Sequence, residues 1–254
     1  MASKKYKNKM CVYCVDSVAT TPDHVFCREF FLHHQRDNLP KVPACTDCNQ
    51  RKSVLEHYLT AVLPLGGRHR HARDQIMEMV PDRMVKNHAL QRQLSAGAQQ
   101  VYEKQQGVLL PTMTLPFNGE RLQGWFVMIV RGLIWHHFKL YLPPEYFVQA
   151  FLATAAGEQI YERNVSALNC PVRVHANLGD GTFEYEGVQA TDAPTSTAWR
   201  ITALGGVRLA GDPRWPDEVT SKIIGFSAHR RVLTVQGQKL LGLGDASIPP
   251  HIPP

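Results

Sequence analysis

The chain has 254 residues, of which 44% are hydrophobic and 20% charged, as in an ordinary globular protein. This length is enough for one large domain or two smaller ones, each with a hydrophobic core. No apolar run reaches the roughly 18 residues of a membrane span, and residues 1–9 are basic but lack the apolar core of a signal peptide. We therefore expect a cytoplasmic protein that makes no use of a membrane.

The charge balance is basic, with 28 Lys and Arg residues against 22 Asp and Glu residues and a formal net charge of +6 at pH 7. An excess of positive charge favours contact with a polyanion such as nucleic acid, although many basic proteins bind none. DNA is therefore one expected partner, and the sequence motifs are the further evidence for or against it.

The cysteines and prolines divide the chain into three predicted parts. Residues 1–9 form a flexible basic arm, residues 10–63 hold four paired cysteines, and residues 64–254 form an accessory region. Within the second part, apolar side chains recur at helical spacing, which predicts a helix from about Asn49 to Val62. The second part is therefore expected to be a small module that ends in a helix.

The accessory region is predicted to be helical first and rich in strands afterwards. The polar residues 68–110 are expected to be helical, and the hydrophobic stretch 118–142 is expected to form a buried helix. A further helix is predicted over residues 145–154. From 165 to 210 apolar and polar residues alternate around an Asp-Gly pair, which predicts a small antiparallel sheet.

Four of the six cysteines form two Cys-x-x-Cys pairs that are thirty residues apart. In a cytosolic protein such pairs indicate metal ligands before disulfides. Each pair places two thiolates on one turn, and two turns supply the tetrahedral sulfur set that Zn²⁺ prefers. A region so short and proline-rich has little core, so zinc is expected to supply much of its folding free energy. The expected ligands are Cys11, Cys14, Cys45 and Cys48; Cys27 either packs or competes as a ligand, and Cys170 is assigned to packing.

Polar residues suited to catalysis lie around the second cysteine pair. Asp23 and His24 lie between the pairs, and Asn49 and Lys52 follow the last cysteine. In the order Cys-x-x-Cys, Asp-His-Val, Cys-x-x-Cys-Asn-x-x-Lys, the chain resembles the HNH endonuclease superfamily. The resemblance implies an α+β fold in which an N-terminal, zinc-stapled ββα-metal (HNH) module precedes a helical region and a small antiparallel β segment.

The same resemblance implies a phosphodiester hydrolase that cuts DNA and leaves 3′-hydroxyl and 5′-phosphate ends. His24 would be the general base, because a neutral imidazole can take a proton from water near neutral pH. Asp23 and Asn49 would bind a catalytic Mg²⁺ or Mn²⁺, since hard ions prefer oxygen ligands. Lys52 and Arg51 would contact the nucleic acid. The zinc would be structural, because a site closed by four sulfurs has no open position.

Each of these residues also has a plainer interpretation. Adjacent side chains on a strand point to opposite faces, so the roles of Asp23 and His24 require a bend or bulge between them. Asn49 is also a good helix N-cap, and Lys52 could be an ordinary solvated charge. Two positions depart from the family pattern. Cys27 stands where related chains often carry Pro, and Asn38, the one candidate for the middle asparagine, lies slightly further before Cys45 than the family pattern has it.

Two other classes of function remain open at this point. A zinc-stabilised module that binds nucleic acid without cutting it needs none of the catalytic set, and its binding would weaken steeply with salt but ignore Mg²⁺. A zinc-stabilised scaffold for protein partners would have no affinity for nucleic acid. A nuclease with one site per chain that cuts both strands favours a homodimer or two successive nicks.

Overall fold

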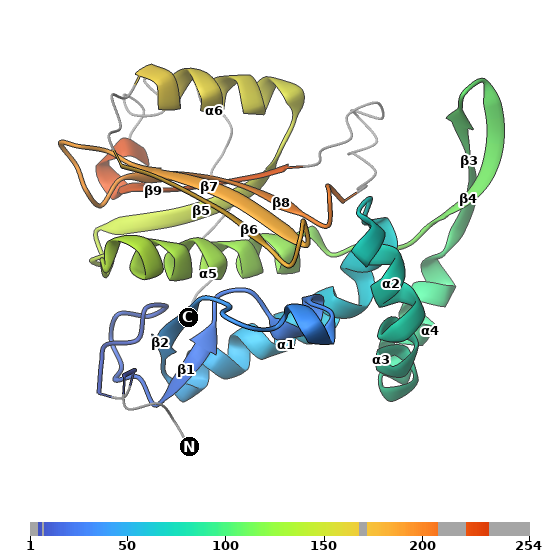
Figure 1. The fold of residues 1–254 in the computed structure, drawn as a ribbon, viewed down its shortest axis with the longest axis horizontal. Helices are drawn as coiled ribbons and strands as arrows, with labels where there is room; N and C mark the ends of the chain where they lie inside the picture. The colour runs from blue at the N-terminus through green and yellow to red at the C-terminus, as the bar shows by residue number, and fades with distance from the viewer. Residues whose placement is uncertain (1–4, 7, 168–171, 208–221, 234–254) are drawn as a thin grey trace.

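The computed structural model describes residues 5–6, 8–167, 172–207 and 222–233 of the chain. Over these residues the protein is a mixed α+β structure with six α-helices and antiparallel sheets, which confirms the predicted class at that level. Figure 1 shows its layers: a short helix, a large antiparallel sheet, a long helix beneath the sheet and the N-terminal elements below that helix.

The N-terminal part is a two-stranded hairpin followed by a helix. Strand β1 (Thr21–His24) pairs antiparallel with β2 (Lys41–Ala44), and the register is unbroken over all four residue pairs. The loop between the strands contains two 3-10 turns, η1 (Arg28–Phe30) and η2 (His33–Gln35). Strand β2 leads directly into helix α1 (Thr46–Val62).

Helix α1 begins earlier than the hydrophobic pattern predicted. Its N-cap is Cys45, whose backbone is extended, and the amide of Asn49 donates to the Cys45 carbonyl oxygen at 3.0 Å. Asp47 lies in the first turn, where a carboxylate interacts favourably with the helix dipole. Asn49 is therefore inside the first turn, and the alternative that it caps the helix is wrong. The predicted end at Val62 is confirmed.

The first part of the predicted helical stretch is helical, after a 3-10 turn, η3 (Leu63–Gly66). Its three helices are α2 (Arg70–Glu78), α3 (Val80–Lys86) and α4 (His88–Gly97). Helix α2 is tied to the sheet through His71, which is buried and lies with Nδ1 3.1 Å from the carbonyl oxygen of Gly179.

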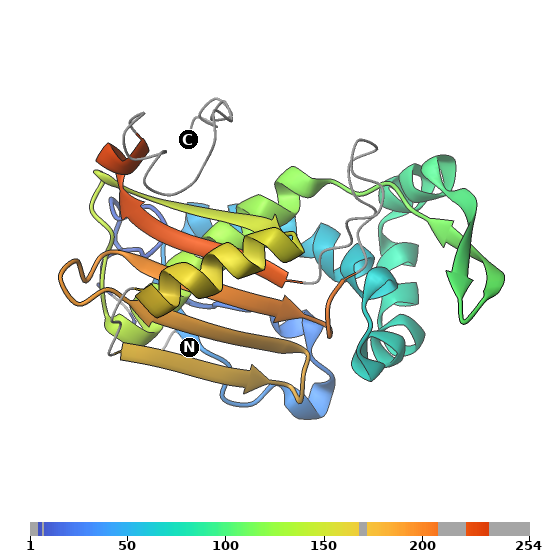
Figure 2. The same cartoon turned by 90° about the horizontal axis from the view of Figure 1, so that it is seen from above.

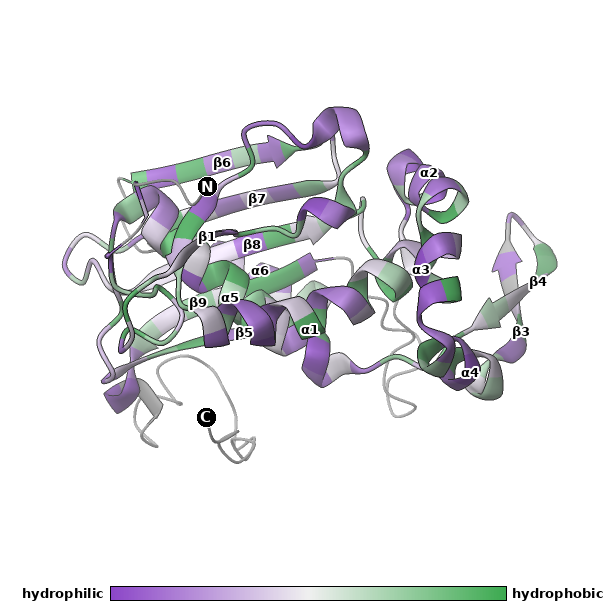
Figure 3. Ribbon diagram, turned by 90° about the horizontal axis from the view of Figure 1, so that it is seen from below, coloured by the Kyte–Doolittle hydropathy of each residue, from purple (hydrophilic) through white to green (hydrophobic). Residues whose placement is uncertain are grey.

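The second part of that stretch is a hairpin, so the helical prediction is wrong there. Strands β3 (Gln99–Gln105) and β4 (Val108–Thr114) pair through a turn at Gln106 and Gly107, whose φ angles are 48° and 84°. Figures 1 and 3 show the hairpin projecting from the body, with hydrophobic residues along β4. Its exposed apolar side chains include Tyr102, Val108, Leu109, Leu110 and Met113.

The predicted buried helix is α5 (Gly119–Phe138). The side chain of Asn118 caps it by accepting a hydrogen bond from the amide of Arg121 at 2.9 Å, and Lys139 ends it in a left-handed conformation. Trp125, among others on this helix, is completely buried. No helix within the described part of the chain is long and apolar enough to cross a membrane.

The antiparallel sheet is larger than predicted and lies between two helices. Helix α6 (Ala155–Ala167) lies across one face of the strands, and α5 covers the other (Figures 1 and 2). The strand order is β5-β9-β8-β7-β6. The strands are β5 (Tyr146–Ala153), β6 (Val172–Leu178), β7 (Phe183–Gln189), β8 (Thr197–Ala203) and β9 (Lys222–His229).

Two predictions about this region need correction. The helix predicted over residues 145–154 is strand β5, which pairs along its whole length with β9, a strand that the sequence reading missed. At the end of the predicted sheet region 165–210, Val207 forms a bridge with Gly67, and residues 208–210 lie outside the described residues. Cys170, the predicted basic arm at positions 1–4 and 7, and the C-terminus from residue 234 also lie outside them.

The N-terminal part shares one hydrophobic core with the rest of the protein. The ring of Phe26 lies 4.8 Å from that of Phe183 in β7, and the ring of Phe30 lies 5.1 Å from that of Trp125. A Cβ atom on Gly132 of α5 would lie 3.0 Å from a methyl carbon of Val25, so glycine allows this close approach. The expectation that residues 10–63 have little core is therefore wrong: they contribute fully buried aromatic rings to a common one.

Candidate metal centre and polar site

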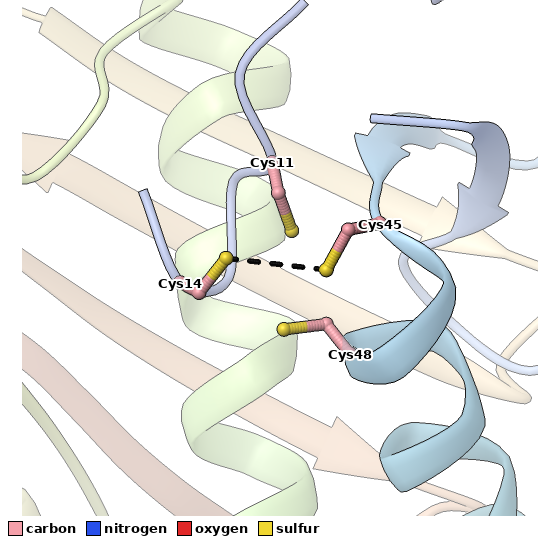
Figure 4. A group of neighbouring side chains, drawn as sticks. All are labelled: Cys11, Cys14, Cys45 and Cys48. Atoms are coloured by element: carbon pink, nitrogen blue, oxygen red, sulfur yellow. Dashed lines mark hydrogen bonds between the residues drawn. The ribbon is translucent and has the colours of Figure 1, made fainter. Parts of the chain in front are cut away.

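The four paired cysteines converge on one point. Cys11 and Cys14 lie in the loop before β1, and Cys45 and Cys48 lie at the start of α1 (Figure 4). Their sulfur atoms all lie within 4.8 Å of one another, and those of Cys14 and Cys45 are 3.9 Å apart. Tetrahedral zinc with Zn–S bonds of about 2.3 Å requires sulfurs about 3.8 Å apart. The cluster could therefore hold a metal ion such as zinc, as the spacing of the cysteines predicted.

The environment of the cluster favours deprotonation of one of its four sulfur atoms, that of Cys11. A hydrogen bond with Cys48 lowers the pKa of Cys11 to about 4, and the same contact raises the pKa of Cys48. Arg51 donates a hydrogen bond from its guanidinium to the Cys48 sulfur at 3.0 Å. A nearby cation favours the deprotonated sulfur that binds metal. Arg51, expected to contact nucleic acid, therefore has the cysteine cluster as its partner in this structure.

Cys27 does not join the cluster. It is packed against the hydrophobic core, and burial raises the pKa of its thiol to about 12. A thiol that resists deprotonation is a poor metal ligand. Of the two interpretations of Cys27, packing is the one that the structure supports.

Asp23 faces helix α1 and is almost completely buried. Its Oδ2 atom accepts a hydrogen bond from the Tyr13 hydroxyl at 2.5 Å and lies 3.1 Å from the Lys52 ammonium nitrogen. Burial, and then the Asp23 charge, raise the pKa of Tyr13 well above its usual value, so the hydroxyl stays protonated and donates. Both contacts fall on one carboxylate oxygen.

Lys52 is completely buried, which contradicts its predicted contact with a phosphate. Its ammonium donates to the carbonyl oxygen of His24 at 2.6 Å and pairs with the carboxylates of Asp23 and Glu56. Burial lowers the pKa of Lys52, but the two carboxylates outweigh this effect and raise it. Glu56 in turn accepts a hydrogen bond from the indole nitrogen of Trp125 at 3.2 Å. Lys52 thus links α1 to β1, and its partner Glu56 links α1 to α5.

His24 ends strand β1 and is half-buried. Burial, followed by the positive charge of Lys41, lowers its pKa to about 4, and the negative charge of Asp23 opposes this shift. The ring is therefore neutral near pH 7. No hydrogen bond involves the imidazole among the residues that the structure describes. The bend expected between Asp23 and His24 is absent, because the β1–β2 register is regular and alternation places the two side chains on opposite faces.

Asn49 in the first turn of α1 lies beside strand β1. Its side-chain amide donates to the hydroxyl of Thr21 at 3.4 Å. Thr21 and Asp23 are two residues apart on the strand, so their side chains share a face. The Asn49 side chain, from α1, and the Asp23 side chain, from β1, therefore lie on the same side of the hairpin.

Sequence reasoning missed two residues of this polar site. Tyr13 lies between the first two cysteines, where nothing in the sequence distinguishes it from a packing residue. Glu56 follows Lys52 by four residues, a spacing that places them on one helix face and favours an ion pair. That spacing was the one available signal. His57, the next residue along α1 after Glu56, is exposed.

Comparison with known proteins adds no identification: no family model, no curated protein and no solved structure matches the chain.

Proposed function

We propose that the protein is a metal-dependent nuclease of the HNH type that hydrolyses DNA phosphodiester bonds. One observation carries the proposal: strand β1, which ends in Asp23 and His24, lies against the first turn of α1, where the Asn49 side chain donates a hydrogen bond to Thr21. This supports a shared oxygen-ligand site between strand and helix, next to the helix start that carries Cys45 and Cys48.

In this proposal each polar residue has one role. Asp23 and Asn49 supply oxygen ligands for Mg²⁺ or Mn²⁺, which would stabilise the negative charge that develops on the phosphate. His24, neutral near pH 7 and without a hydrogen-bond partner among the described residues, accepts the proton of the attacking water. The four cysteines hold zinc in a closed site that takes no part in the reaction.

The direct test is cleavage of a supercoiled plasmid by the purified full chain with Mg²⁺ or Mn²⁺. We expect nicking that EDTA abolishes and that His24→Ala reduces by about 10²–10⁴-fold, the usual contribution of a general base. His57→Ala is the matched control, because it removes an exposed histidine of the neighbouring helix. Undiminished metal-dependent nicking by His24→Ala would exclude the assigned role.

A second candidate is a zinc-stabilised module that binds nucleic acid without cutting it. Two observations favour it: Oδ2 of Asp23 is already occupied by Tyr13 and Lys52, and the regular register separates Asp23 from His24. This candidate predicts DNA retention that weakens with salt and is the same with Mg²⁺ and with EDTA. Retention without nicking by either the wild type or His24→Ala would support it.

Because Lys52 is buried, other cations would have to contact the phosphates in this proposal, and Arg28 and Lys41 are the candidates. Lys41 lies directly opposite His24 on β2, Arg28 begins η1, and both are exposed and close enough to His24 to lower its pKa. We expect Arg28→Gln with Lys41→Gln to weaken binding of duplex DNA in EDTA. The log–log dependence of affinity on salt should become shallower by about 2, one for each lost contact.

The matched control for this pair is Lys86→Gln with Arg92→Gln, which removes the same charge from exposed positions on α3 and α4. Its salt dependence should equal that of the wild type. If both double variants lost DNA affinity and salt dependence equally, the effect would come from net charge rather than from a phosphate site beside His24. Filter binding or fluorescence anisotropy over a series of salt concentrations measures both.

A further inference from the structure

The carboxylate of Asp23 is held by a residue from inside the first cysteine pair. Tyr13 lies between Cys11 and Cys14, its ring is buried, and its hydroxyl donates to Oδ2 of Asp23 at 2.5 Å. The two sulfurs on either side of Tyr13 belong to the four-cysteine cluster. The position of this hydroxyl is thus fixed by the same turn that supplies two of the sulfur atoms.

A second buried partner reaches the same oxygen from another direction. The Lys52 ammonium lies 3.1 Å from Oδ2 and is itself fixed by the His24 carbonyl oxygen and by Glu56. A carboxylate with one oxygen held by two rigid donors cannot rotate freely. It presents Oδ1, the other oxygen, in one direction. Groups that orient a metal ligand in this way commonly change metal affinity or activity 10–100-fold when removed.

We propose that Tyr13 is a positioning residue that couples the cysteine cluster to the divalent-metal ligand Asp23. The hydroxyl holds Oδ2, so that Oδ1 is the oxygen that faces the catalytic ion. Tyr13 does not touch the ion or the substrate in this assignment. This inference rests on the proposed function, because it gives Asp23 the role of a metal ligand.

The test is Tyr13→Phe in the full, zinc-loaded chain. The substitution keeps the buried ring and removes only the donor. We expect an unchanged zinc content and a 10–100-fold weaker binding of Mn²⁺, measured without DNA by electron paramagnetic resonance. The Mn²⁺ concentration for half-maximal nicking should rise by a similar factor, and saturating Mn²⁺ should restore most of the rate.

Tyr58→Phe is the matched control. Tyr58 is also a buried tyrosine of the N-terminal part, and its hydroxyl accepts a hydrogen bond from the backbone amide of Asn118 at 2.9 Å, away from Asp23. It should leave the Mn²⁺ dependence unchanged. If Tyr13→Phe lowers the nicking rate without changing the Mn²⁺ dependence, Tyr13 supports the fold only and the positioning role is wrong.

Failure of this inference is distinct from failure of the proposed function. A wild type that nicks with Mn²⁺, an inactive His24→Ala variant and a Tyr13→Phe variant with wild-type Mn²⁺ affinity would remove the role of Tyr13 alone. A wild type that binds zinc but neither binds Mn²⁺ nor nicks DNA would overturn both.

Discussion

Replacing Cys48 by alanine is expected to abolish zinc binding and to lower the melting temperature by roughly 10 °C or more. Structural zinc contributes about 10–16 kcal/mol to small folded sites, whereas whole domains are stable by about 5–15 kcal/mol. The common core with α5 and the sheet retains part of this stability. Even a net loss of about 4 kcal/mol lowers the melting temperature by about 8–16 °C in a chain of this size.

The control for Cys48→Ala is Cys27→Ala, because Cys27 is also a free cysteine but lies outside the cluster. It should bind one zinc ion per chain, as we expect for the wild type, and should melt within a few degrees of it. Atomic emission measures the zinc content, and circular dichroism measures the melting. Identical zinc content in the two variants would show that the four sulfurs are not the metal site.

Replacing Lys52 by methionine is expected to destabilise the protein by about 3–5 kcal/mol, because it leaves the buried carboxylates of Asp23 and Glu56 without their cation. The corresponding fall in melting temperature is about 6–20 °C. Methionine matches the length of the lysine stem, so packing is largely kept and the lost charge dominates. Thermal or urea unfolding at constant pH and zinc concentration measures the change.

Two further variants separate charge from shape. Lys86→Met replaces an exposed lysine and should change stability by less than about 0.5 kcal/mol. Adding Glu56→Gln to Lys52→Met removes one orphaned charge, while the amide oxygen can still accept from Trp125. The double variant should therefore be more stable than Lys52→Met alone. If both Lys52→Met and Lys86→Met were neutral, the buried ion pairs would contribute nothing to stability.

Local patterns predicted the elements that depend on local chemistry. Helix α1 followed from the spacing of its apolar residues and helix α5 from its long hydrophobic stretch. The four-cysteine cluster followed from the two Cys-x-x-Cys pairs. Strand β5 was misread because its apolar run also fits a helix, and its partner β9 lies about seventy residues later. The hairpin of β3 and β4 was missed because β4 is exposed along nearly its whole length and shows no alternation of buried and exposed residues.

The sequence predicted which residues make up most of the polar site, but not which of them contact one another. Nothing in the sequence indicated that Lys52 is buried, since lysine is almost never buried unless it is paired. Its partners Asp23 and Tyr13 come from other elements that only the fold brings near α1. The sequence also did not predict that the strand is regular at His24 or that Lys41 lies opposite it. Both follow from the pairing of β1 with β2.

The shared core also sets an order of events during synthesis. Phe26 packs against Phe183, which the ribosome adds more than 150 residues later. At about 5–20 residues per second, the N-terminal aromatic rings stay uncovered for roughly 8 to 30 s. All four clustered cysteines are made within the first 48 residues. A metal ion held by this cluster could therefore fix the N-terminal turns while the surface that α5 and β7 later cover is still open to chaperones.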